Sequence, residues 1–313
     1  MMTPATVAET GRKVVSSVEK VIIGKHQVIE LVLCALFSEG HLLIEDVPGV
    51  GKTMLAKAVA RSLGCSYARI QCTPDLLPSD ILGVNVFNQK TGDFLFRSGP
   101  IHHHIVLVDE INRATPKTQS ALLECMEERQ VSIDTVTMAL PRPFMVIATQ
   151  NPIETDGTFP LPEAQLDRFF MRLSLGYPSF DAENEMLVGQ QLVHPIEGIK
   201  AVVTLEELMA MQQIVKAVHV EATLREYIVK IVQKTRDSST LSLGASPRGS
   251  LSLFRASQAH GALKGRDYVI PDDVKAMASV TLSHRIKGRY DFSRNGEGQR
   301  VIQEVLGEVT VPV

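Results

Sequence analysis

The sequence predicts an α/β domain followed by a helical domain, and three observations lead to this prediction. Short apolar runs rich in β-branched residues recur between helical stretches up to about Pro178. A glycine-containing turn directly after the first run opens one of these helical stretches. Beyond Pro178 only helical patterns continue. Alternation of this kind is typical of a parallel sheet covered by helices on both faces.

Five of the apolar runs are expected to be core strands, because each is short and bounded by polar residues or glycine. In chain order they are HLLIED, YARIQC, HIVLVDE, FMVIATQN and FFMRLSLG. The stretch TMLAKAVARSL, which follows the first run, has Leu55, Val59 and Leu63 four residues apart. That spacing predicts a helix with one apolar face.

The C-terminal part is expected to be helical throughout. In TLEELMAMQQIV, Thr204 and Glu207 have the spacing of a capping box at a helix start. In VIPDDVKAMASVTL, Pro271 falls in the first turn, and two aspartates follow it near the positive end of the helix dipole. No further strand of the core type follows GYPSFD. We therefore expect an α/β domain over residues 1–179 and a helical domain over residues 180–313.

Two segments of the first domain alternate between apolar and polar residues with period two. They are VNVFNQKTGDFLF and QVSIDTVTMAL, and each has strand-like arms around a polar turn. Both predict β-hairpins, over about residues 84–96 and 131–140, inserted before the third and fourth core strands. The pattern alone leaves open whether they have a function or are merely extra edge strands.

The composition argues against several classes of protein. Lys and Arg number 32 and Asp and Glu 35, and the formal charge of -3 predicts neither a surface that coats nucleic acid nor an acidic tail. The four cysteines form no CxxC pair and are expected to be buried thiols in a reducing compartment. The first residues lack the apolar core of a signal peptide, and no run approaches the ~18 apolar residues of a membrane span. We therefore expect a cytoplasmic protein without membrane insertion.

The turn EDVPGVGKT has most features of a phosphate-binding P-loop, although Asp46 stands where that pattern has its first glycine. Gly49 and Gly51 are present where the chain must turn and approach a phosphate closely. Lys52 can reach the β- and γ-phosphates, and the Thr53 hydroxyl can ligate Mg²⁺. Backbone N–H groups at the start of the following helix would attract the phosphates. We predict a nucleotide site; a glycine-rich turn that binds nothing is the alternative.

The strand HIVLVDE ends in two carboxylates, Asp109 and Glu110. Asp109 can hold Mg²⁺ through water, and Glu110 can polarise the water that attacks the γ-phosphate. A solvated acidic pair is the alternative. The next strand ends in Asn151, which could fix that water, although Asn151 and Pro152 could also form an ordinary turn. Three strand ends converging on one point favour the catalytic interpretation.

Two other motifs are given no functional role. Three histidines, His102 to His104, precede the third core strand and are expected to be a lead-in to it. Adjacent side chains alternate sides on an extended chain, so the three cannot converge on one metal ion. The basic stretch SHRIKGR could touch nucleic acid or an acidic partner, but basic side chains on a surface are usually just solvated.

Taken together, the blocks EDVPGVGKT, VLVDEINRA, ERQVSIDTVTMALPRPFMVIATQNP and LPEAQLDRFFMRL resemble those of MoxR-type AAA+ ATPases. SPRGSLSLFRA and VIPDDVKAMASVTLSHRI resemble the helical lid of that family, and the resemblance runs from about Ile22 to Ile286. Asp in place of the first P-loop glycine is usual there, so Asp46 does not argue against ATP binding. The resemblance implies an AAA+ core with sheet order 5-1-4-3-2, a C-terminal helical lid and a hexameric ring. It also implies that the hairpins are the helix-2 insert and the pre-sensor-1 hairpin, which face the pore or the partner in related rings.

The resemblance also assigns residues. Lys52 and Thr53 match Walker A, and Asp109 and Glu110 match Walker B, so Thr53 and Asp109 are the expected Mg²⁺ ligands. Asn151 matches sensor 1. The segment VIIGK resembles the stretch that packs on adenine, with a helix start as the alternative. The residues expected to contact ATP are Ile23, Gly24, Val47, Pro48, Gly49, Val50, Gly51, Lys52, Thr53 and Met54.

Two arginines complete the set implied by the resemblance. Arg168 in QLDRFF matches the arginine finger that reaches the γ-phosphate of a neighbouring subunit, where fingers contribute about 10³ to 10⁵ in rate. Arg248 in SPRG matches sensor 2. The lid can be repositioned in this branch, so whether Arg248 serves its own site or a neighbour's stays open. From position alone, both arginines could be surface ion-pair partners.

Three functions follow from these predictions. The first is an ATP-driven chaperone that remodels or matures a client protein, which the resemblance links to a von Willebrand factor A domain partner and to metal or cofactor insertion. The second is a motor on nucleic acid, which the charge of -3 and the 5% aromatic content disfavour. The third is a nucleotide-regulated scaffold, which would not need Glu110, Asn151 and Arg168.

Overall fold

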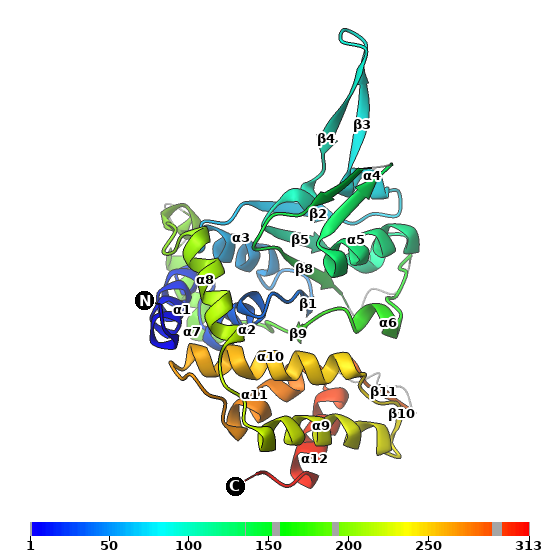
Figure 1. The fold of residues 1–313 in the computed structure, drawn as a ribbon. Coiled ribbons are helices and arrows are strands. Elements are labelled where there is room, and N and C mark those ends of the chain that lie inside the picture. Colours follow the sequence, from blue (N-terminus) through cyan, green and yellow to red (C-terminus); the bar gives the residue numbers. More distant parts are fainter. Residues whose placement is uncertain (1, 135, 152–156, 190–193, 290–295, 313) are drawn as a thin grey trace.

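A parallel sheet of five strands forms the centre of the N-terminal part (Figure 1). The computed structural model describes residues 2–134, 136–151, 157–189, 194–289 and 296–312. The sheet has the order β2-β5-β8-β1-β9. Its strands are β1 (Leu42–Glu45), β2 (Tyr67–Gln71), β5 (Ile105–Asp109), β8 (Met145–Gln150) and β9 (Met171–Leu173). All five predicted core strands are present, and numbered along the chain their order is the expected 5-1-4-3-2.

The two faces of the sheet are covered by different helices. Alternate strand residues such as Leu42, Ile44 and Ile147 belong to a core shared with α1 (Pro4–Glu19), α2 (His26–Phe37) and α3 (Lys52–Ser62). The intervening residues, such as Leu43 and Val146, belong to a second core with α4 (Pro78–Leu82) and α5 (Pro116–Glu128). This division follows from the alternation of side chains along a strand.

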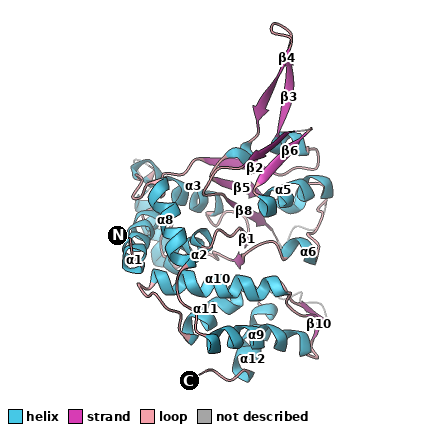
Figure 2. Ribbon diagram, in the orientation of Figure 1, coloured by secondary structure: helices cyan, strands magenta, loops and turns pink. Residues whose placement is uncertain are grey.

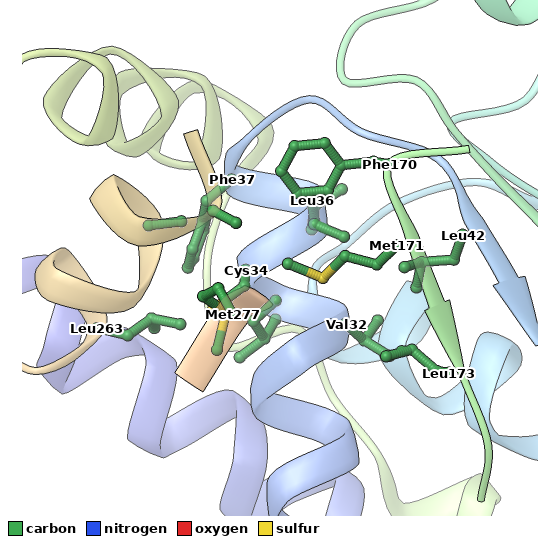
Figure 3. Packing of buried hydrophobic residues seen from close by; sticks show 14 of the residues in the cluster. Val32, Cys34, Leu36, Phe37, Leu42, Phe170, Met171, Leu173, Leu263 and Met277 are labelled. Carbon is green, nitrogen blue, oxygen red and sulfur yellow. The ribbon is translucent and has the colours of Figure 1, made fainter. Parts of the chain in front are cut away.

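The first core continues without interruption into the helical part. Val32 and Leu36 of α2 lie toward Met171 and Leu173 of β9 on one side. On the other side α2 approaches Leu263 and Met277 from the C-terminal helices (Figure 3). One apolar cluster therefore spans the α/β and helical parts of the chain. Burial of apolar surface on this scale is the main favourable term in folding.

Two β-hairpins are inserted in the α/β part. The strands β3 (Gly83–Asn88) and β4 (Asp93–Ser98) pair antiparallel and project far from the body (Figures 1 and 2). The strands β6 (Gln130–Ile133) and β7 (Val136–Ala139) form the second hairpin. Both predicted hairpins are thus present. The two are joined where Asn85 Nδ2 donates a hydrogen bond to Asp134 Oδ2 at 2.7 Å.

Short elements connect the strands and helices of the α/β part. They are the 3₁₀ turns η1 (Pro100–His102) and η2 (Ile111–Arg113) and the short helix α6 (Glu163–Leu166). The turn η1 contains the first histidine of the trio, which was expected to be extended, so that expectation is wrong for His102.

The C-terminal part is mainly helical, as Figure 2 shows. Its elements are α7 (Phe180–Gly189), η3 (Pro195–Gly198), α8 (Leu205–Lys216), α9 (Ala222–Asp237), α10 (Pro247–Leu263), α11 (Pro271–Leu282) and α12 (Glu297–Glu308). The predicted capping box at Thr204 and Glu207 is confirmed at the start of α8. The division between residues 179 and 180 stays a prediction.

The expectation that this part contains helices alone is wrong. A small antiparallel pair, β10 (Leu241–Leu243) and β11 (Lys287–Gly288), joins the loops beside α10 and α11. The strand β10 has three residues and β11 has two, which is too short to leave a period-two pattern in the sequence. No described helix is long and apolar enough to cross a bilayer.

His41 links three elements of the α/β part at the entry to β1. It is buried, and its Nδ1 accepts a hydrogen bond from the backbone N–H of Val146 at 3.0 Å. Its Nε2 lies 2.9 Å from the carbonyl oxygen of Met126 in α5. Since Nδ1 must accept, Nε2 carries the proton and the ring is neutral. Burial lowers the pKa of His41 to about 4.

The lowered pKa predicts an acid-sensitive fold. Below pH 6.5, the ordinary pKa of histidine, His41 is protonated in the unfolded chain. In the folded chain it stays neutral down to about pH 4. The contribution of His41 is complete above 6.5 and falls by roughly 3 kcal/mol as the pH drops to 4. His41→Gln carries no charge at either pH, so the difference in unfolding free energy between wild type and variant should shrink over this range. Urea unfolding at several pH values measures it, and a constant difference would contradict the prediction.

Candidate functional site

The loop between β1 and α3 has the backbone of a phosphate-binding turn. Gly49 and Gly51 have φ angles of 86° and 94°, in the left-handed region that glycine adopts without strain. Gly51 is the N-cap residue of α3, and Lys52 is the first residue of that helix. The unpaired N–H groups of the first turn, with the helix dipole, favour an anion at this point. The predicted loop residues from Val47 to Met54 therefore surround one helix N-terminus.

Asp46 explains why the loop tolerates a carboxylate in place of glycine. Its Oδ2 accepts hydrogen bonds from the backbone N–H groups of Leu175 at 2.6 Å and Gly176 at 2.7 Å. The hydroxyl of Ser174 donates to the same oxygen at 3.0 Å. Asp46 is 8% exposed. The side chain is thus held by the segment after β9, and it fastens the start of the P-loop to that segment.

The backbone of Asp46 also meets the P-loop lysine. Lys52 Nζ donates a hydrogen bond to the carbonyl oxygen of Asp46 at 2.8 Å. This contact folds the lysine side chain back across its own loop, beside the helix start. The lysine charge is therefore held where phosphate oxygens would bind.

The two carboxylates after β5 are held by side chains from both neighbouring strands. Asp109 Oδ2 accepts from Arg69 of β2 at 2.7 Å, and Oδ1 accepts from the Thr149 hydroxyl of β8 at 2.5 Å. Glu110 Oε2 accepts from Gln71 of β2 at 3.0 Å and from Arg113 at 3.1 Å. No sequence motif assigns a role to any of these partners.

The backbone at Glu110 is unusual. Its φ of 57° lies in the left-handed region, which a residue with a side chain rarely adopts. Its N–H donates to the Thr149 hydroxyl at 3.0 Å, which helps to hold this conformation. Such strained residues cluster at functional sites, where the surroundings fix the geometry. The turn points the Glu110 side chain away from the strand direction and toward Gln71 and Arg113.

The strand register brings the predicted catalytic residues to one edge of the sheet. Glu45 of β1 is level with Gln150 of β8, and Val108 of β5 is level with Ala148. Asn151 comes directly after β8. It therefore lies at the same edge of the sheet as the start of the P-loop and as Asp109, the last residue of β5. Asn151 is 7% exposed. The alternative turn at Asn151 and Pro152 involves a position outside the described residues.

The segment expected to contact adenine is a turn between α1 and α2. The segment ends at Lys25, which is the N-cap of α2, so the alternative of a helix start stays open. Gly24 has a φ of 72°, and a Cβ there would lie 3.3 Å from Ala182 of α7. A Cβ on Gly51 would lie 3.7 Å from Ile22 Cδ1, so Ile22 lies beside the P-loop. The contact of Ile23 and Gly24 with adenine stays a prediction.

The histidine trio makes three separate contacts. His102 Nε2 lies 3.1 Å from the Leu82 carbonyl oxygen, His103 Nδ1 lies 3.0 Å from that of Pro100, and His104 Nδ1 lies 2.8 Å from the Ser66 hydroxyl. In the described part of the chain no His, Cys, Asp and Glu cluster could hold a metal ion.

The two predicted catalytic arginines lie together on one carboxylate. Arg168 Nε lies 3.3 Å from Glu127 Oε2, and Arg248 Nη2 forms an ion pair with Glu127 Oε1. Arg168 follows α6, Arg248 lies in the first turn of α10, and Glu127 lies near the end of α5. Three elements far apart in sequence therefore converge here.

A pocket of about 230 Å³ surrounds this group. None of the described P-loop residues lines it, so the arginines and the P-loop occupy separate places on the subunit. The charged side chains of its wall are Glu39, Glu127, Arg129, Asp167, Arg168, Arg248, Arg255 and Arg285. Arginine outnumbers acidic residues, so the pocket is suited to an anion.

The basic stretch SHRIKGR is only partly a solvated surface, because Lys287 and Arg289 are exposed but His284 and Arg285 are buried, contrary to expectation. His284 is 4% and Arg285 5% exposed. Arg285 Nε donates to Asp167 Oδ1 at 2.9 Å, and its Nη2 donates to the Phe169 carbonyl oxygen at 2.6 Å. Burial lowers the pKa of Arg285 to about 10, while Asp167 opposes that shift. This arginine binds the lid to the residue before Arg168.

Comparison with protein families matches residues 41–171 to the ATPase family associated with various cellular activities (AAA) and residues 233–305 to the AAA lid domain. Chaperone MoxR1 of Mycobacterium tuberculosis is 40% identical, covering 98% of this chain and 84% of that protein. Protein MoxR of Paracoccus denitrificans is 30% identical, covering 93% of each. A crystal structure of a candidate ATPase from Cytophaga hutchinsonii superposes with a TM-score of 0.89 and 35% identity, covering 99% of this chain and 97% of that one.

Replacing Asp46 with the glycine of the usual P-loop pattern should lower the stability of the fold. Asp46→Gly leaves the N–H groups of Leu175 and Gly176 without their acceptor, which costs about 1–3 kcal/mol for each one left unsatisfied. The variant should unfold at a lower temperature and bind ATP no more tightly than wild type. Calorimetric unfolding and nucleotide titration test this, with Ser174→Ala as the milder control. Unchanged stability would refute the fastening role of Asp46.

Proposed function

Because this chain belongs to the MoxR family of AAA+ ATPases, we propose that it is a chaperone whose subunits form a hexameric ring and use ATP hydrolysis to remodel or mature a client protein. The observation that carries the proposal is the location of Arg168 and Arg248. They share Glu127 in a pocket that no described P-loop residue lines. An ATP site that needs these arginines is then completed by a second subunit.

Within one subunit, the proposed roles follow the edge of the sheet. Lys52 and the N-terminus of α3 bind the phosphates, Glu110 is the general base, and Asn151 positions the attacking water. Thr53 and Asp109 would hold Mg²⁺, and their hydroxyl and carboxylate oxygens are the ligands that this ion prefers. Bound Mg²⁺ supplies positive charge against the charge that develops on the γ-phosphate.

Arg168 and Arg248 are proposed to act on the nucleotide of the neighbouring subunit. A guanidinium group placed on the developing charge of the γ-phosphate stabilises the transition state. Arg248 lies beside Arg168 on the same carboxylate, which supports a role for the pair between subunits. Hydrolysis then requires assembly and becomes a property of the ring.

The projecting hairpin is proposed as the part that meets the client or its partner. Val86, Phe87, Phe94 and Leu95 of β3 and β4 are 47%, 51%, 70% and 59% exposed. Large exposed apolar side chains in such a group mark interaction surfaces. The family resemblance favours a partner with a von Willebrand factor A domain, and metal or cofactor insertion as the work performed.

Assembly and hydrolysis should rise together with protein concentration. Glu110→Gln retains the nucleotide-binding residues and should form rings with Mg-ATP while turnover stops. Lys52→Ala should not bind ATP and should form no rings by itself, so that it enters rings only beside subunits that bind ATP. Sedimentation velocity with and without Mg-ATP, with ATPase activity measured on the same samples, tests this. A wild-type monomer that hydrolyses ATP at a concentration-independent rate would contradict the ring proposal.

Mixed rings should reveal a site shared between subunits. Arg168→Ala should bind ATP almost normally yet lose turnover by about 10³-fold or more. Lys52→Ala subunits are inactive themselves but carry intact arginines, so mixing the two variants should restore part of the activity. Titrating one variant against the other measures the recovery. No recovery in mixed rings of confirmed composition would exclude the action of Arg168 on a neighbour.

A further inference from the structure

We propose that Glu127 is a positioning residue that holds Arg168 and Arg248 as one cationic pair, ready for the terminal phosphate of a nucleotide bound to a second copy of this chain. The inference rests on the proposed function, because it assumes that the two arginines act between subunits. It adds a residue of α5 to that site, and neither the sequence motifs nor the family comparisons point to it.

The geometry of the ion pairs supports this role. Each oxygen of the Glu127 carboxylate takes a different arginine: Oε2 takes Nε of Arg168 at 3.3 Å, and Oε1 takes Nη2 of Arg248. The two guanidinium groups are therefore brought within the width of one carboxylate. Among the described residues, no other acidic side chain forms an ion pair with either arginine.

Charge explains why a carboxylate is needed between them. Two guanidinium groups at one place repel each other, and they are charged at any physiological pH. Without an anion they would turn apart into solvent, since their side chains are 32% and 47% exposed. Glu127 offsets one of the two charges. The group keeps a net positive charge and can still attract a phosphate.

The elements that carry the three side chains are themselves anchored. At the end of α5, Arg129 Nη2 donates to the Glu39 carbonyl oxygen at 2.6 Å, and its Nη1 pairs with the Glu39 carboxylate at 3.2 Å. Arg129 ends the helix two residues after Glu127. The end of α5 that carries Glu127 is thus held in place by the contacts of Arg129 with Glu39.

The side chain of Asp167 connects the chain segments that carry the two arginines. Asp167 Oδ2 accepts from the Ser246 hydroxyl at 2.8 Å, and Oδ1 accepts from Arg285 at 2.9 Å. Asp167 directly precedes Arg168, and Ser246 is the N-cap of the helix that carries Arg248. The backbone on both sides of the pair is therefore fixed, and Glu127 fixes the side chains.

The arrangement leaves room for the phosphate. The nitrogen of Arg168 that lies closest to Glu127 is Nε, Arg248 donates to Glu127 from Nη2, and a guanidinium group carries five N–H donors. Both arginines line the pocket of about 230 Å³. An incoming phosphate can therefore take hydrogen bonds from both arginines while Glu127 keeps its own contacts.

The test is Glu127→Gln, compared with Glu128→Gln in the assembled protein. Glu128 is the neighbouring exposed residue on α5, and no described cation forms an ion pair with it. Glu127→Gln should lower kcat about 10- to 100-fold, the effect of a misplaced catalytic group, with the KM for ATP changed less than about threefold. Glu127→Asp, which keeps the charge, should recover part of kcat, and Glu128→Gln should match wild type.

Two further measurements separate positioning from folding and from the ring proposal. Thermal unfolding and sedimentation should be the same for Glu127→Gln and wild type. Mixing Glu127→Gln with Lys52→Ala subunits should restore turnover, because the latter supply an intact pair. If Arg168→Ala loses turnover while Glu127→Gln keeps it, or if Glu127→Gln is faster than wild type, the inference about Glu127 fails and the shared site stands. If Arg168→Ala keeps full turnover, the proposed function itself fails.

Discussion

The hydrogen bonds of the Asp46 carboxylate are the interaction on which the rest of the arrangement depends. One carboxylate oxygen accepts hydrogen bonds from Ser174, Leu175 and Gly176. These bonds fix the end of β1 against the segment after β9. The P-loop starts from this fixed point, and its lysine folds back onto the same residue. Since β1 lies between β8 and β9, the position of the loop relative to Asn151 follows from the sheet register.

The parallel sheet explains how the sequence alone could predict a place for a nucleotide site. Carboxyl ends of parallel strands meet at one edge, so Lys52, Asp109 and Asn151 could be brought together from their places after apolar runs. The structure has these strands in the expected order. The same rule could have found Arg69 and Gln71, because they alternate with Ile70 near the end of β2. They were missed because no motif marks them.

Other features lay beyond the reach of sequence patterns. In the sequence, Glu127 is one of several acidic residues of a helix and nothing marks it out. Its partners are 41 and 121 residues away, so only tertiary packing brings them together. Arg285 was expected at the surface because a basic run usually is solvated. Its burial is balanced by an ion pair with Asp167, which lies 118 residues away in the chain, and by hydrogen bonds to backbone carbonyl oxygens such as that of Phe169. The β10 and β11 pair was missed because it is too short for periodicity to indicate a strand.

The helical part is fixed in a way that does not suit a lid closing over the nucleotide of its own subunit. A single apolar core runs from the sheet through α2 into α10 and α11, and the buried ion pair of Arg285 and Asp167 adds to it. Separating these parts would expose that core and leave a charge buried without a partner, which is strongly unfavourable. In the structure this packing and the shared Glu127 hold Arg248 beside Arg168. Under the proposed function, a sensor arginine held in this way responds to the nucleotide that a second subunit brings to it.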